Sequence, residues 1–402
     1  MRLKVLGEGV VALVLSAALV GGAWAQSPAP GVTDSEVVIG ITTPLSGPAA
    51  AWGTTGLASE AWAKHVNEQG GVHGRKIRVV MKDDAYVPGR AVANITEMKD
   101  SVFAIVGLLG SAVMNASKDL VAESKIPTIY PYGDPQIWVR QGTDKARYVF
   151  AVYTDYGDEG EFLVQQAAKI AGAKKVAVFY QNDEYGKGYL EGIQRGIKGL
   201  GGRVALVAEV SYELQDRQLG THALKLKESG ADVVIPAATT THGANLVKEM
   251  AKVGYRPKIF APFPFGDHQV MYRLLGDLWE GVHYNGNIPT TSDPESQRII
   301  QLLIKQEPKL KGREAFALAG GIAMMTAVEG LKRAGKNLTR DSYVEAMEGI
   351  KNWVPGNLKW TPITFGPGRH HGLNTVRMYR ANKAADQSFV PVTDFQTFPP
   401  HF

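Results

Sequence analysis

Few residues in this chain have the types and spacing that catalysis or metal binding requires. His370 and His371 are the only adjacent histidines, and they stand in a Gly-rich turn without Glu or Cys at metal-ligand spacing. Asp83 and Asp84 form a carboxylate pair, but neighbouring residues at a strand end point apart and cannot act as an acid/base couple. We therefore interpret the histidines as a solvated loop and the aspartates as structural, and we expect no catalytic residue and no metal site.

Common enzyme signatures are absent from the rest of the sequence. It contains no G-x-S-x-G, H-E-x-x-H or G-x-x-x-x-G-K-[ST] motif, and no dinucleotide-binding glycine pattern after the first strand. The chain has no Cys, which excludes disulfides, thiolate zinc sites and cysteine nucleophiles. These absences favour a protein that is not an enzyme and that needs no cofactor.

One serine stands where helices commonly bind small anions. Ser111 follows the apolar strand Val102–Val106 and precedes a helix that we expect to begin near Val113. The first N–H groups of a helix lack intrahelical partners, and the helix dipole favours negative charge beside them. Ser111 could contact a ligand there or cap the helix, and one residue can do both.

The elements that must position these residues alternate between strand and helix. Short apolar runs closed by turn residues predict a first series of strands at Val37–Ile41, Ile77–Met81, Val102–Val106 and Pro127–Tyr130. A second series of strands follows Tyr153, at Lys175–Tyr180, Arg203–Val210, Asp232–Ile235 and Lys258–Ala261, with helices at Tyr185–Leu200, Leu219–Glu228 and Ala244–Val253. Two consecutive β-α-β series predict an α/β fold of two doubly wound, Rossmann-like lobes.

The last part of the chain must return to these two lobes. Glu314–Ala334 and Asp341–Gly349 are predicted helices, and the tail from Asn357 is rich in Pro and Gly and strand-like. These elements are not followed by a third parallel sheet. A chain that crosses repeatedly between two lobes forms a hinge, and the cleft between the lobes is then the natural binding site.

The first 25 residues have the pattern of an export signal. Arg2 and Lys4 precede an apolar run from Val10 to Val20, and Ala23-Trp24-Ala25 is a small-x-small cleavage site. We predict cleavage after Ala25 and a periplasmic location. Without this segment 42 basic and 38 acidic residues remain, a net charge of +4 that is spread along the chain, so no nucleic-acid partner is indicated.

Seven motifs follow one another in a family-like order: Pro44–Gly53 (PLSGPAAAWG), Asn67–Ile77 (NEQGGVHGRKI), Asp83–Ala85 (DDA), Gly107–Ala112 (GLLGSA), Ile126–Pro131 (IPTIYP), Gln181–Gly188 (QNDEYGKG) and Ser229–Val234 (SGADVV). In this order and spacing the chain resembles periplasmic solute-binding proteins of the Leu/Ile/Val-binding type, which serve ABC importers of branched-chain amino acids. The resemblance runs from about Val37 to Gly286 and is weaker beyond. It implies the periplasmic binding protein type I fold, with two lobes joined by a three-strand hinge.

The resemblance also implies where the lobes begin and end. We expect residues 35–153 and 288–355 in the first lobe, and residues 154–287 and 360–402, with a tail that crosses the hinge, in the second. The expected crossovers lie near Tyr153–Asp155, Gly281–Asn287 and Trp353–Phe365. The implied function is that of a monomer that captures a small organic solute between closing lobes and delivers it to an ABC permease and ATPase at the inner membrane. A ligand-sensing periplasmic receptor of the same fold is the alternative.

In the first lobe, the resemblance places the ligand carboxylate at the loop Gly107–Ala112, where Ser111 supplies a hydroxyl and residues such as Ala112 supply backbone N–H groups. The next loop, which contains Tyr132, supplies a Thr hydroxyl in relatives that bind amino acids, and Asp134 stands where that Thr is expected. A carboxylate facing a ligand carboxylate would be repulsive. Alternatively, Asp134 turns away and begins the following turn, a common role of Asp. Both interpretations remain open.

Two aromatic residues stand at family positions that contact the ligand. Trp52 falls where the family has an aromatic wall, although a buried core Trp is the competing explanation. Tyr185 falls where the family has a Tyr that closes over the ligand, and a Tyr can stack while its hydroxyl finds a polar partner.

The second lobe departs from the relatives that bind amino acids. Thr239 and Phe263 stand where those relatives have a Tyr and an acid, and Thr240 adds a further hydroxyl. A buried ammonium without a counter-charge costs several kcal/mol. We therefore expect an apolar or aromatic acid or amide, with its polar end at Ser111, rather than a simple amino acid.

Overall fold

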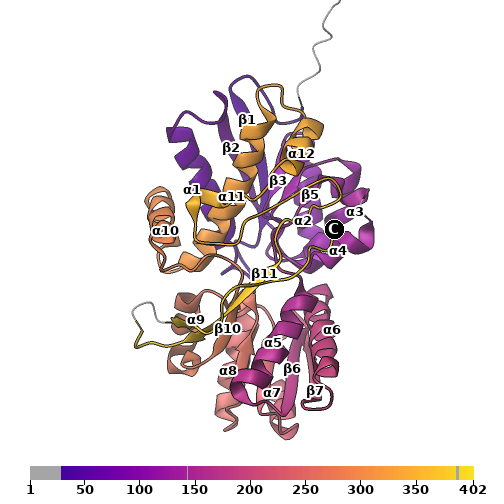
Figure 1. Ribbon diagram of the computed structural model, residues 1–402, viewed down its shortest axis with the longest axis vertical. Helices are drawn as coiled ribbons and strands as arrows, with labels where there is room; N and C mark the ends of the chain where they lie inside the picture. The colour runs from indigo at the N-terminus through magenta and orange to yellow at the C-terminus, as the bar shows by residue number, and fades with distance from the viewer. Residues whose placement is uncertain (1–28, 143, 386–388) are drawn as a thin grey trace, which may run out of the picture.

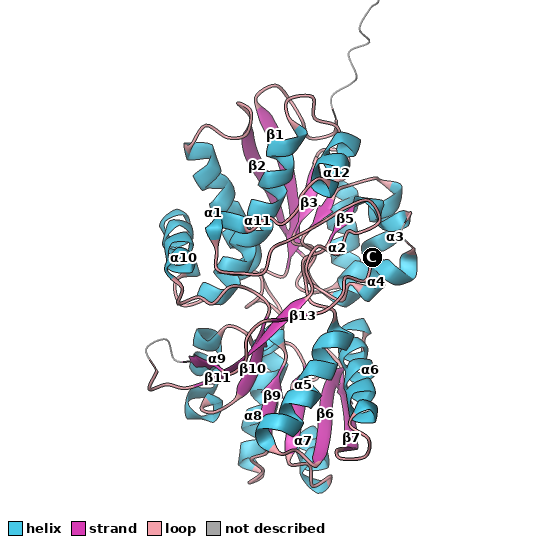
Figure 2. Cartoon of the chain, in the orientation of Figure 1, coloured by secondary structure: helices cyan, strands magenta, loops and turns pink. Residues whose placement is uncertain are grey.

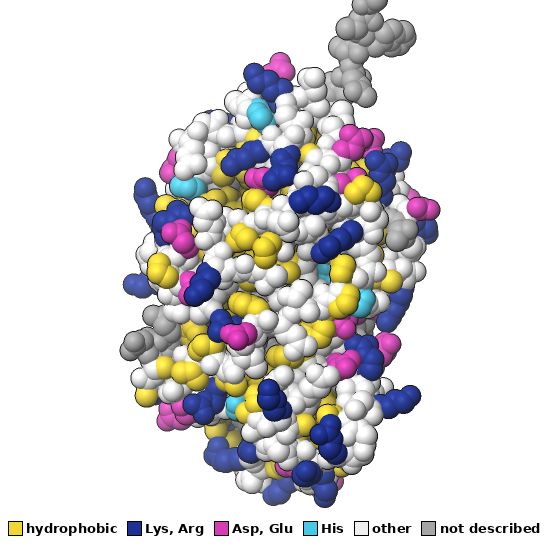
Figure 3. Space-filling view, in the orientation of Figure 1, with side chains coloured by type: hydrophobic (Ala, Val, Ile, Leu, Met, Phe, Trp, Pro, Cys, Tyr) yellow, Lys and Arg dark blue, Asp and Glu magenta, His cyan; other side chains and the backbone are white. Residues whose placement is uncertain are grey.

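The chain folds into two α/β lobes that lie one above the other along the long axis of the molecule (Figure 1). The computed structural model describes residues 29–142, 144–385 and 389–402, so the predicted export signal lies outside the described residues. The predicted two-lobed α/β fold is confirmed, and helices lie on both sides of the sheets (Figure 2). Basic and acidic side chains are interspersed over the face shown in Figure 3.

The first lobe contains a five-stranded parallel sheet in the order β2-β1-β3-β4-β5. Its strands are β1 (Glu36–Thr43), β2 (Lys76–Asp83), β3 (Ala104–Val106), β4 (Thr128–Ile129) and β5 (Val149–Phe150). Its helices are α1 (Thr54–Glu68), α2 (Pro88–Met98), α3 (Ser111–Glu123), α4 (Gln136–Gln141), α10 (Pro294–Gln306), α11 (Glu314–Ala334) and α12 (Arg340–Glu348). The three central strands are almost wholly buried, as is typical of parallel sheets covered on both faces.

The second lobe repeats this strand order as β7-β6-β8-β9-β10 and adds the antiparallel strands β11 and β12 beyond β10. Its strands are β6 (Lys175–Gln181), β7 (Ala205–Tyr212), β8 (Val233–Ala237), β9 (Lys258–Ala261), β10 (His283–Gly286), β11 (Thr375–Ala381) and β12 (Phe389–Pro391), while β13 (Gln396–Thr397) pairs with β11. Its helices are α5 (Tyr156–Ala171), α6 (Glu184–Gly199), α7 (Gly220–Glu228), α8 (Thr240–Lys252) and α9 (His268–Leu275).

The chain passes between the lobes three times before its C-terminal tail returns to the first lobe. It leaves the first sheet after β5, returns to the first lobe between β10 and α10, and enters the second sheet again at β11. The first and third passages lie side by side, because the Thr154 hydroxyl donates to the Thr375 carbonyl at 2.7 Å and Ala151 forms a bridge with His371. The second and third passages lie later in the chain than the expected Gly281–Asn287 and Trp353–Phe365.

The segment 360–402, expected in the second lobe, divides between the two lobes. β11 and β12 extend the second sheet, but the ring of Phe365 packs edge-on against Phe150 of the first lobe at 5.2 Å. The C-terminal Phe402 joins a cluster of first-lobe residues, and its carbonyl accepts from the His371 N–H at 2.8 Å. Phe365 and Phe402 are both buried against the first-lobe core, and this burial of apolar rings explains why the tail crosses back to that lobe.

Helix α11 forms the centre of the first lobe. It is the one helix in the described part of the chain that is long and apolar enough to cross a membrane, and 89% of its most apolar window is buried inside the protein. Small residues allow it to approach α1 closely: the Ser59 hydroxyl donates to the Gly320 carbonyl at 2.8 Å, and a Cβ on Gly320 would lie 2.1 Å from the Thr55 carbonyl oxygen. Its sequence therefore reflects close packing of helices in a core.

Candidate functional site

A small cavity lies between the lobes, at the carboxyl ends of the central strands. Its volume is about 40 Å³, and its wall consists of Ala49, Trp52, Tyr86, Leu109, Gly110, Tyr132, Tyr153, Tyr156, Tyr185, Thr239 and Pro264. Trp52 follows β1, Gly110 follows β3, Tyr185 follows β6 and Thr239 follows β8. These are the strand pairs at which the sheet order reverses in each lobe, and ligands of open α/β sheets bind at such points.

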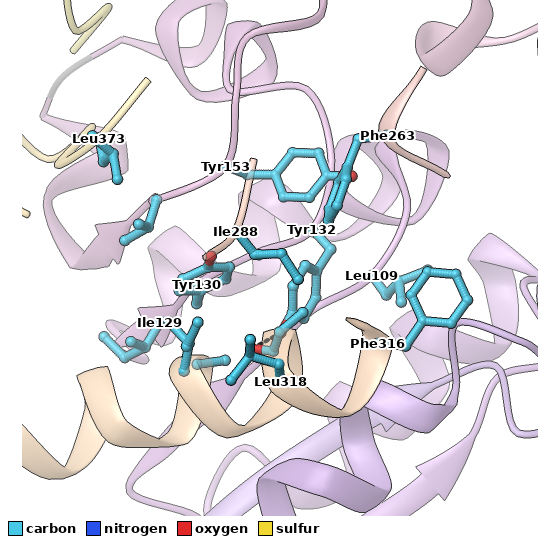
Figure 4. Close-up of a cluster of buried hydrophobic side chains, with 14 of the residues drawn as sticks. Leu109, Ile129, Tyr130, Tyr132, Tyr153, Phe263, Ile288, Phe316, Leu318 and Leu373 are labelled. Atoms are coloured by element: carbon cyan, nitrogen blue, oxygen red, sulfur yellow. Dashed lines mark hydrogen bonds between the residues drawn. The ribbon is translucent and has the colours of Figure 1, made fainter. Parts of the chain in front are cut away.

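Aromatic rings make up most of the wall and connect the lobes. The Trp52 ring lies 4.5 Å from Phe316, 5.4 Å from Phe263 and 5.9 Å from Tyr132, measured between centroids. Its indole N–H donates to the Pro264 carbonyl at 3.2 Å, which links the first lobe to the loop after β9. Figure 4 shows Tyr132, Tyr153 and Phe263 close together, with Phe316 beside Leu109. Trp52 is thus a contact between the lobes as well as part of the cavity wall.

The first-lobe side of the site is the N-terminus of α3. Ser111 is the first residue of the helix, two positions earlier than expected, and Gly110 occupies the N-cap position with φ 104°. No side chain caps this helix, so the predicted capping role of Ser111 is wrong; its hydroxyl instead accepts from the Asp134 N–H at 3.1 Å. Ser111 is fully buried behind the wall, and Ala112 is partly exposed. The hydroxyl fixes the spacing between this helix and the next loop.

Asp134 combines the two roles left open by the sequence. One carboxylate oxygen accepts from the Gln136 N–H at 3.0 Å and so begins the turn into α4. The other faces the second lobe, since a Cβ on Gly188 would lie 2.7 Å from it. Burial, followed by the nearby charge of Asp155, raises the pKa of Asp134. The side chain lies between the lobes but outside the cavity wall.

The second-lobe candidates lie at the starts of α6 and α8. The Tyr185 hydroxyl donates to the Ala238 carbonyl at 3.0 Å, and Thr239 caps α8 by accepting from the His242 N–H. Thr240 donates to the Pro264 carbonyl at 2.9 Å. Phe263 begins the short 3-10 helix Phe263–Phe265, and its ring meets Trp52. Tyr185 and Thr239 are therefore on the cavity wall, whereas Thr240 and Phe263 support it from behind.

Three tyrosines on the wall were missed from the sequence. Tyr86 follows β2 directly, so the rule that ligands bind at the carboxyl ends of parallel strands could have found it. Tyr153 and Tyr156 lie at the first passage between the lobes. Tyr153 and Tyr156 meet edge to face at 5.9 Å, and Tyr156 meets Tyr185 at 5.3 Å. The rings therefore form a continuous layer from the hinge to the second lobe.

Behind this layer lies a fourth missed residue, Glu159 of α5. It is fully buried, and its carboxylate accepts from the Phe263 N–H at 2.7 Å, the Tyr189 hydroxyl at 2.7 Å and the Asn285 amide at 3.3 Å. Burial raises the pKa of Glu159 to about 7, against the opposing effect of these hydrogen bonds. A sequence pattern could not reveal it, because its partners are far away along the chain.

The histidine pair does not form a solvated loop, contrary to the sequence-based expectation. His370 is 5% exposed and stacks on Phe150 at 4.2 Å, while fully buried His371 bonds the Tyr153 carbonyl oxygen at 2.9 Å through Nε2. Burial lowers the pKa of His371 to about 4. Both histidines therefore have a packing role at the hinge.

Three donors that could hold a metal ion do lie together at the hinge: Asp155, Asp158 and His401. His401 Nε2 is 2.7 Å from Asp158 and 3.7 Å from Asp155. Asp158 also accepts from Arg195 at 3.1 Å and from the Asn374 amide at 2.7 Å. Since a guanidinium already neutralises this carboxylate, the arrangement is that of an ion-pair network.

Comparison with known proteins settles the family. The family model described as periplasmic binding protein matches residues 36–386. The chain belongs to this family. Leu/Ile/Val-binding protein homolog 1 of Brucella abortus is 26% identical over 408 residues, covering 96% of this chain and 98% of the relative. The resemblance to the Leu/Ile/Val-binding type is confirmed.

Solved structures agree on the fold. A branched-chain amino acid ABC transporter protein from Thermus thermophilus with bound valine has a TM-score of 0.80 at 20% identity, covering 91% of this chain and 98% of that one. A solute-binding protein of an ABC transporter from R. palustris in complex with benzoate has a TM-score of 0.76 at 18% identity, covering 89% and 96%. The same fold thus holds an amino acid in one protein and an aromatic acid in another.

Proposed function

We propose that this protein is the periplasmic substrate-binding component of an ABC importer that captures a small apolar or aromatic acid or amide. The main support is the composition of the cavity wall. Among the described residues, the eleven that line it include six aromatic side chains and no charged one. An α-amino acid would bury its ammonium against this wall without a counter-charge, which costs several kcal/mol. A carboxylate or amide end could instead meet the start of α3, beside Gly110.

The alternative reading, an importer of leucine or valine, has support from relatives named for those ligands. Its weakness lies at position 263, where a Phe stands in place of the expected acid. Glu159 is close to that position, but its carboxylate already accepts three hydrogen bonds and lies behind the tyrosine layer. Release to a permease and ATPase, a periplasmic location and a monomeric state belong to the same proposal, supported by the family and by the predicted export signal.

A thermal-shift screen tests the ligand class. Benzoate, benzamide and close analogues are compared with leucine and valine at equal concentrations. A ligand at a hundred times its Kd stabilises the folded state by about 2.7 kcal/mol, which raises Tm by several degrees in a protein of this size. The proposal expects shifts with the aromatic compounds. A clear shift with leucine or valine alone would overturn it.

Two tyrosines form a matched pair that tests the location of the site. Tyr185 and Tyr255 belong to the second lobe, and each hydroxyl donates to a backbone carbonyl, Ala238 at 3.0 Å and Ala231 at 2.8 Å. Only Tyr185 lies on the cavity wall. Tyr185→Phe should weaken ligand binding by about fivefold, as expected for a lost hydrogen bond of about 1 kcal/mol that orients the ring. Tyr255→Phe should leave Kd unchanged; equal effects in calorimetry would place the ligand elsewhere.

A further inference from the structure

Glu159 joins three separate pieces of the cavity wall. Its first carboxylate oxygen accepts from the backbone N–H of Phe263, the residue before Pro264, whose carbonyl receives Trp52. The same oxygen accepts from Asn285 at the end of β10. The second oxygen accepts from Tyr189, whose ring stacks on Tyr156 at 4.4 Å. One side chain therefore fixes the loop after β9, the last strand before the second passage, and the tyrosine layer.

The partners of Glu159 are all neutral. In the described part of the chain Glu159 has no ion pair within 4 Å with Lys, Arg or His. Its neighbours along the chain are Asp155, Tyr156 and Asp158. Of the aromatic groups, Tyr189 of α6 donates to it, and its charge adds to burial in raising the pKa values of Tyr153 and Tyr185. The nearby cations are engaged elsewhere: Arg195 and His401 bind Asp158 on the hinge side.

Asp134 is a second buried carboxyl close to the same tyrosine layer, approached from the first lobe. It is 2% exposed, and its charge, like that of Glu159, adds to burial in raising the pKa of Tyr156. Besides burial, the charges of Asp155 and Glu191 raise the pKa of Asp134, and the charge of Arg140 lowers it. Arg140 also pairs with Glu191 at 3.3 Å. Asp134 also has a hydrogen bond that Glu159 lacks, from the N–H of its own turn. The two groups must therefore be tested separately.

We infer that Glu159 takes up a proton from solvent when an anionic solute binds, and that this makes the binding of acids, but not of neutral amides, depend on pH. This inference rests on the proposed function. When a carboxylate solute enters, one proton from solvent moves to the Glu159 oxygen that faces Tyr189, so that the cavity gains no second negative charge. When the solute leaves, the proton returns to solvent. A neutral amide solute produces no exchange.

The hydrogen bonds around Glu159 accommodate both protonation states. The ionised carboxylate accepts all three bonds. The protonated form keeps one oxygen as the acceptor for Phe263 and Asn285, while its O–H donates to the Tyr189 oxygen, because a Tyr hydroxyl can accept as well as donate. The wall therefore keeps its shape while the charge behind it changes. The pKa of about 7 places this exchange near neutral pH.

The direction of the pH effect follows from this exchange. At pH values above the pKa, an anionic solute binds only together with a proton, so its Kd rises by up to tenfold per pH unit. Below the pKa the proton is already present and Kd is constant. Between pH 6 and pH 8 we expect the Kd of benzoate to rise by about tenfold. The Kd of benzamide should stay constant over the same range.

Calorimetry with the mature protein provides the test. Benzoate and benzamide are titrated at pH 7.5 in two buffers of different ionisation enthalpy, which reports the protons taken up per solute bound. Wild-type protein should take up a substantial fraction of one proton with benzoate and none with benzamide. Glu159→Gln, which keeps the shape and a donor for Tyr189, should bind benzoate without proton uptake and with a Kd independent of pH.

Two further variants separate the neighbouring carboxyls. Asp158→Asn alters the adjacent residue on the hinge side and should retain proton uptake. If uptake is lost in Asp134→Asn but kept in Glu159→Gln, the linkage belongs to Asp134 and the inference is overturned. Should Glu159→Gln fail to fold, the wild-type comparison of benzoate with benzamide across pH still decides, since equal pH profiles contradict the inference. If benzoate binds with no uptake, only this inference fails; if neither compound binds, the proposed function fails with it.

Discussion

Two adjacent residues of α5, Asp158 and Glu159, show that the hinge and the cavity wall shift the pKa of a carboxyl group in opposite directions. Asp158 faces the hinge, where hydrogen bonds from His401 and Asn374, with the charges of His401 and Arg195, outweigh burial and lower its pKa. Glu159 faces the cavity wall, where only neutral donors reach it and burial raises its pKa to about 7. A single turn of helix thus carries one carboxyl that stays ionised and one that can change charge.

The difference indicates which region is fixed and which can respond to a ligand. At the hinge, the Asp158 network connects α5 to the C-terminal tail through His401 and to the third passage through Asn374. These charged contacts hold segments of the hinge together. At the wall, Glu159 organises the rings while its own charge remains uncompensated. The following predictions test this contrast in order of expected effect.

The largest effect is expected from Glu159→Ala. Removing the carboxyl leaves the Phe263 N–H, the Tyr189 hydroxyl and the Asn285 amide without their partner in a buried place. Unsatisfied buried donors cost about 1–3 kcal/mol each, so we expect the free energy of unfolding to fall by about 3 kcal/mol in urea titrations. Glu159→Gln is the control and should lose about 1 kcal/mol or less. Equal stabilities of the two variants would show that these bonds do not support the wall.

The pH dependence of stability should have opposite signs at the two residues. Glu159 holds a proton in the folded state up to about pH 7 but loses it at its ordinary pKa of 4.5 when unfolded, so it makes stability fall as pH rises between these values. The slope approaches about 1.4 kcal/mol per pH unit for one proton. Glu159→Gln should abolish this slope in unfolding experiments from pH 4.5 to 7. An unchanged slope would contradict the environment assigned to Glu159.

Asp158 contributes stability in a different window. Its pKa is lowered, so its contribution is present above 3.8 and is lost as pH falls through the lowered value. The pKa of His401 is raised by its bond to Asp158. The stability that His401 contributes is therefore complete below pH 6.5 and is lost as pH rises through the raised pKa. The hinge network is therefore strongest between about pH 4 and 6.5.

The smallest effect is expected from Asp158→Asn. At pH 5.5 this variant should lose about 1–2 kcal/mol of unfolding free energy, because the cations His401 and Arg195 lose their negatively charged partner. At pH 8.5 the loss should be smaller, because the charge of His401 is lost as pH rises through its raised pKa. At each of these pH values the variant should bind the solute with the same affinity as the wild-type protein. A loss that is equal at the two pH values would remove His401 from the network.

The sequence predicted the fold well because its signals are local. Apolar runs closed by turns marked most strands of both sheets, and Glu314–Ala334 was placed at its observed bounds. The resemblance to the solute-binding family led to Trp52 and Tyr185, which both line the cavity. By contrast, helix α5 was not predicted, and with it the residues that hold the tyrosine layer together were overlooked.

The missing parts of the site depend on contacts between distant residues. Glu159 meets Phe263 across 104 positions and Asn285 across 126, and local patterning carries no trace of either contact. The burial of His371 likewise depends on the C-terminal tail returning over it, since its N–H donates to the Phe402 carbonyl. The capping role predicted for Ser111 was wrong because its partner, the Asp134 N–H, lies on another loop.

The central claim is that both lobes hold a small aromatic solute by closing on it. Small-angle X-ray scattering of the mature protein, alone and saturated with the acid or amide that gives the largest thermal shift, tests this directly. The account predicts a smaller radius of gyration with bound solute, because the solute favours the closed arrangement, in which Trp52 of the first lobe meets the Pro264 loop of the second as it does in this structure. A radius of gyration that is identical with and without saturating solute would contradict it.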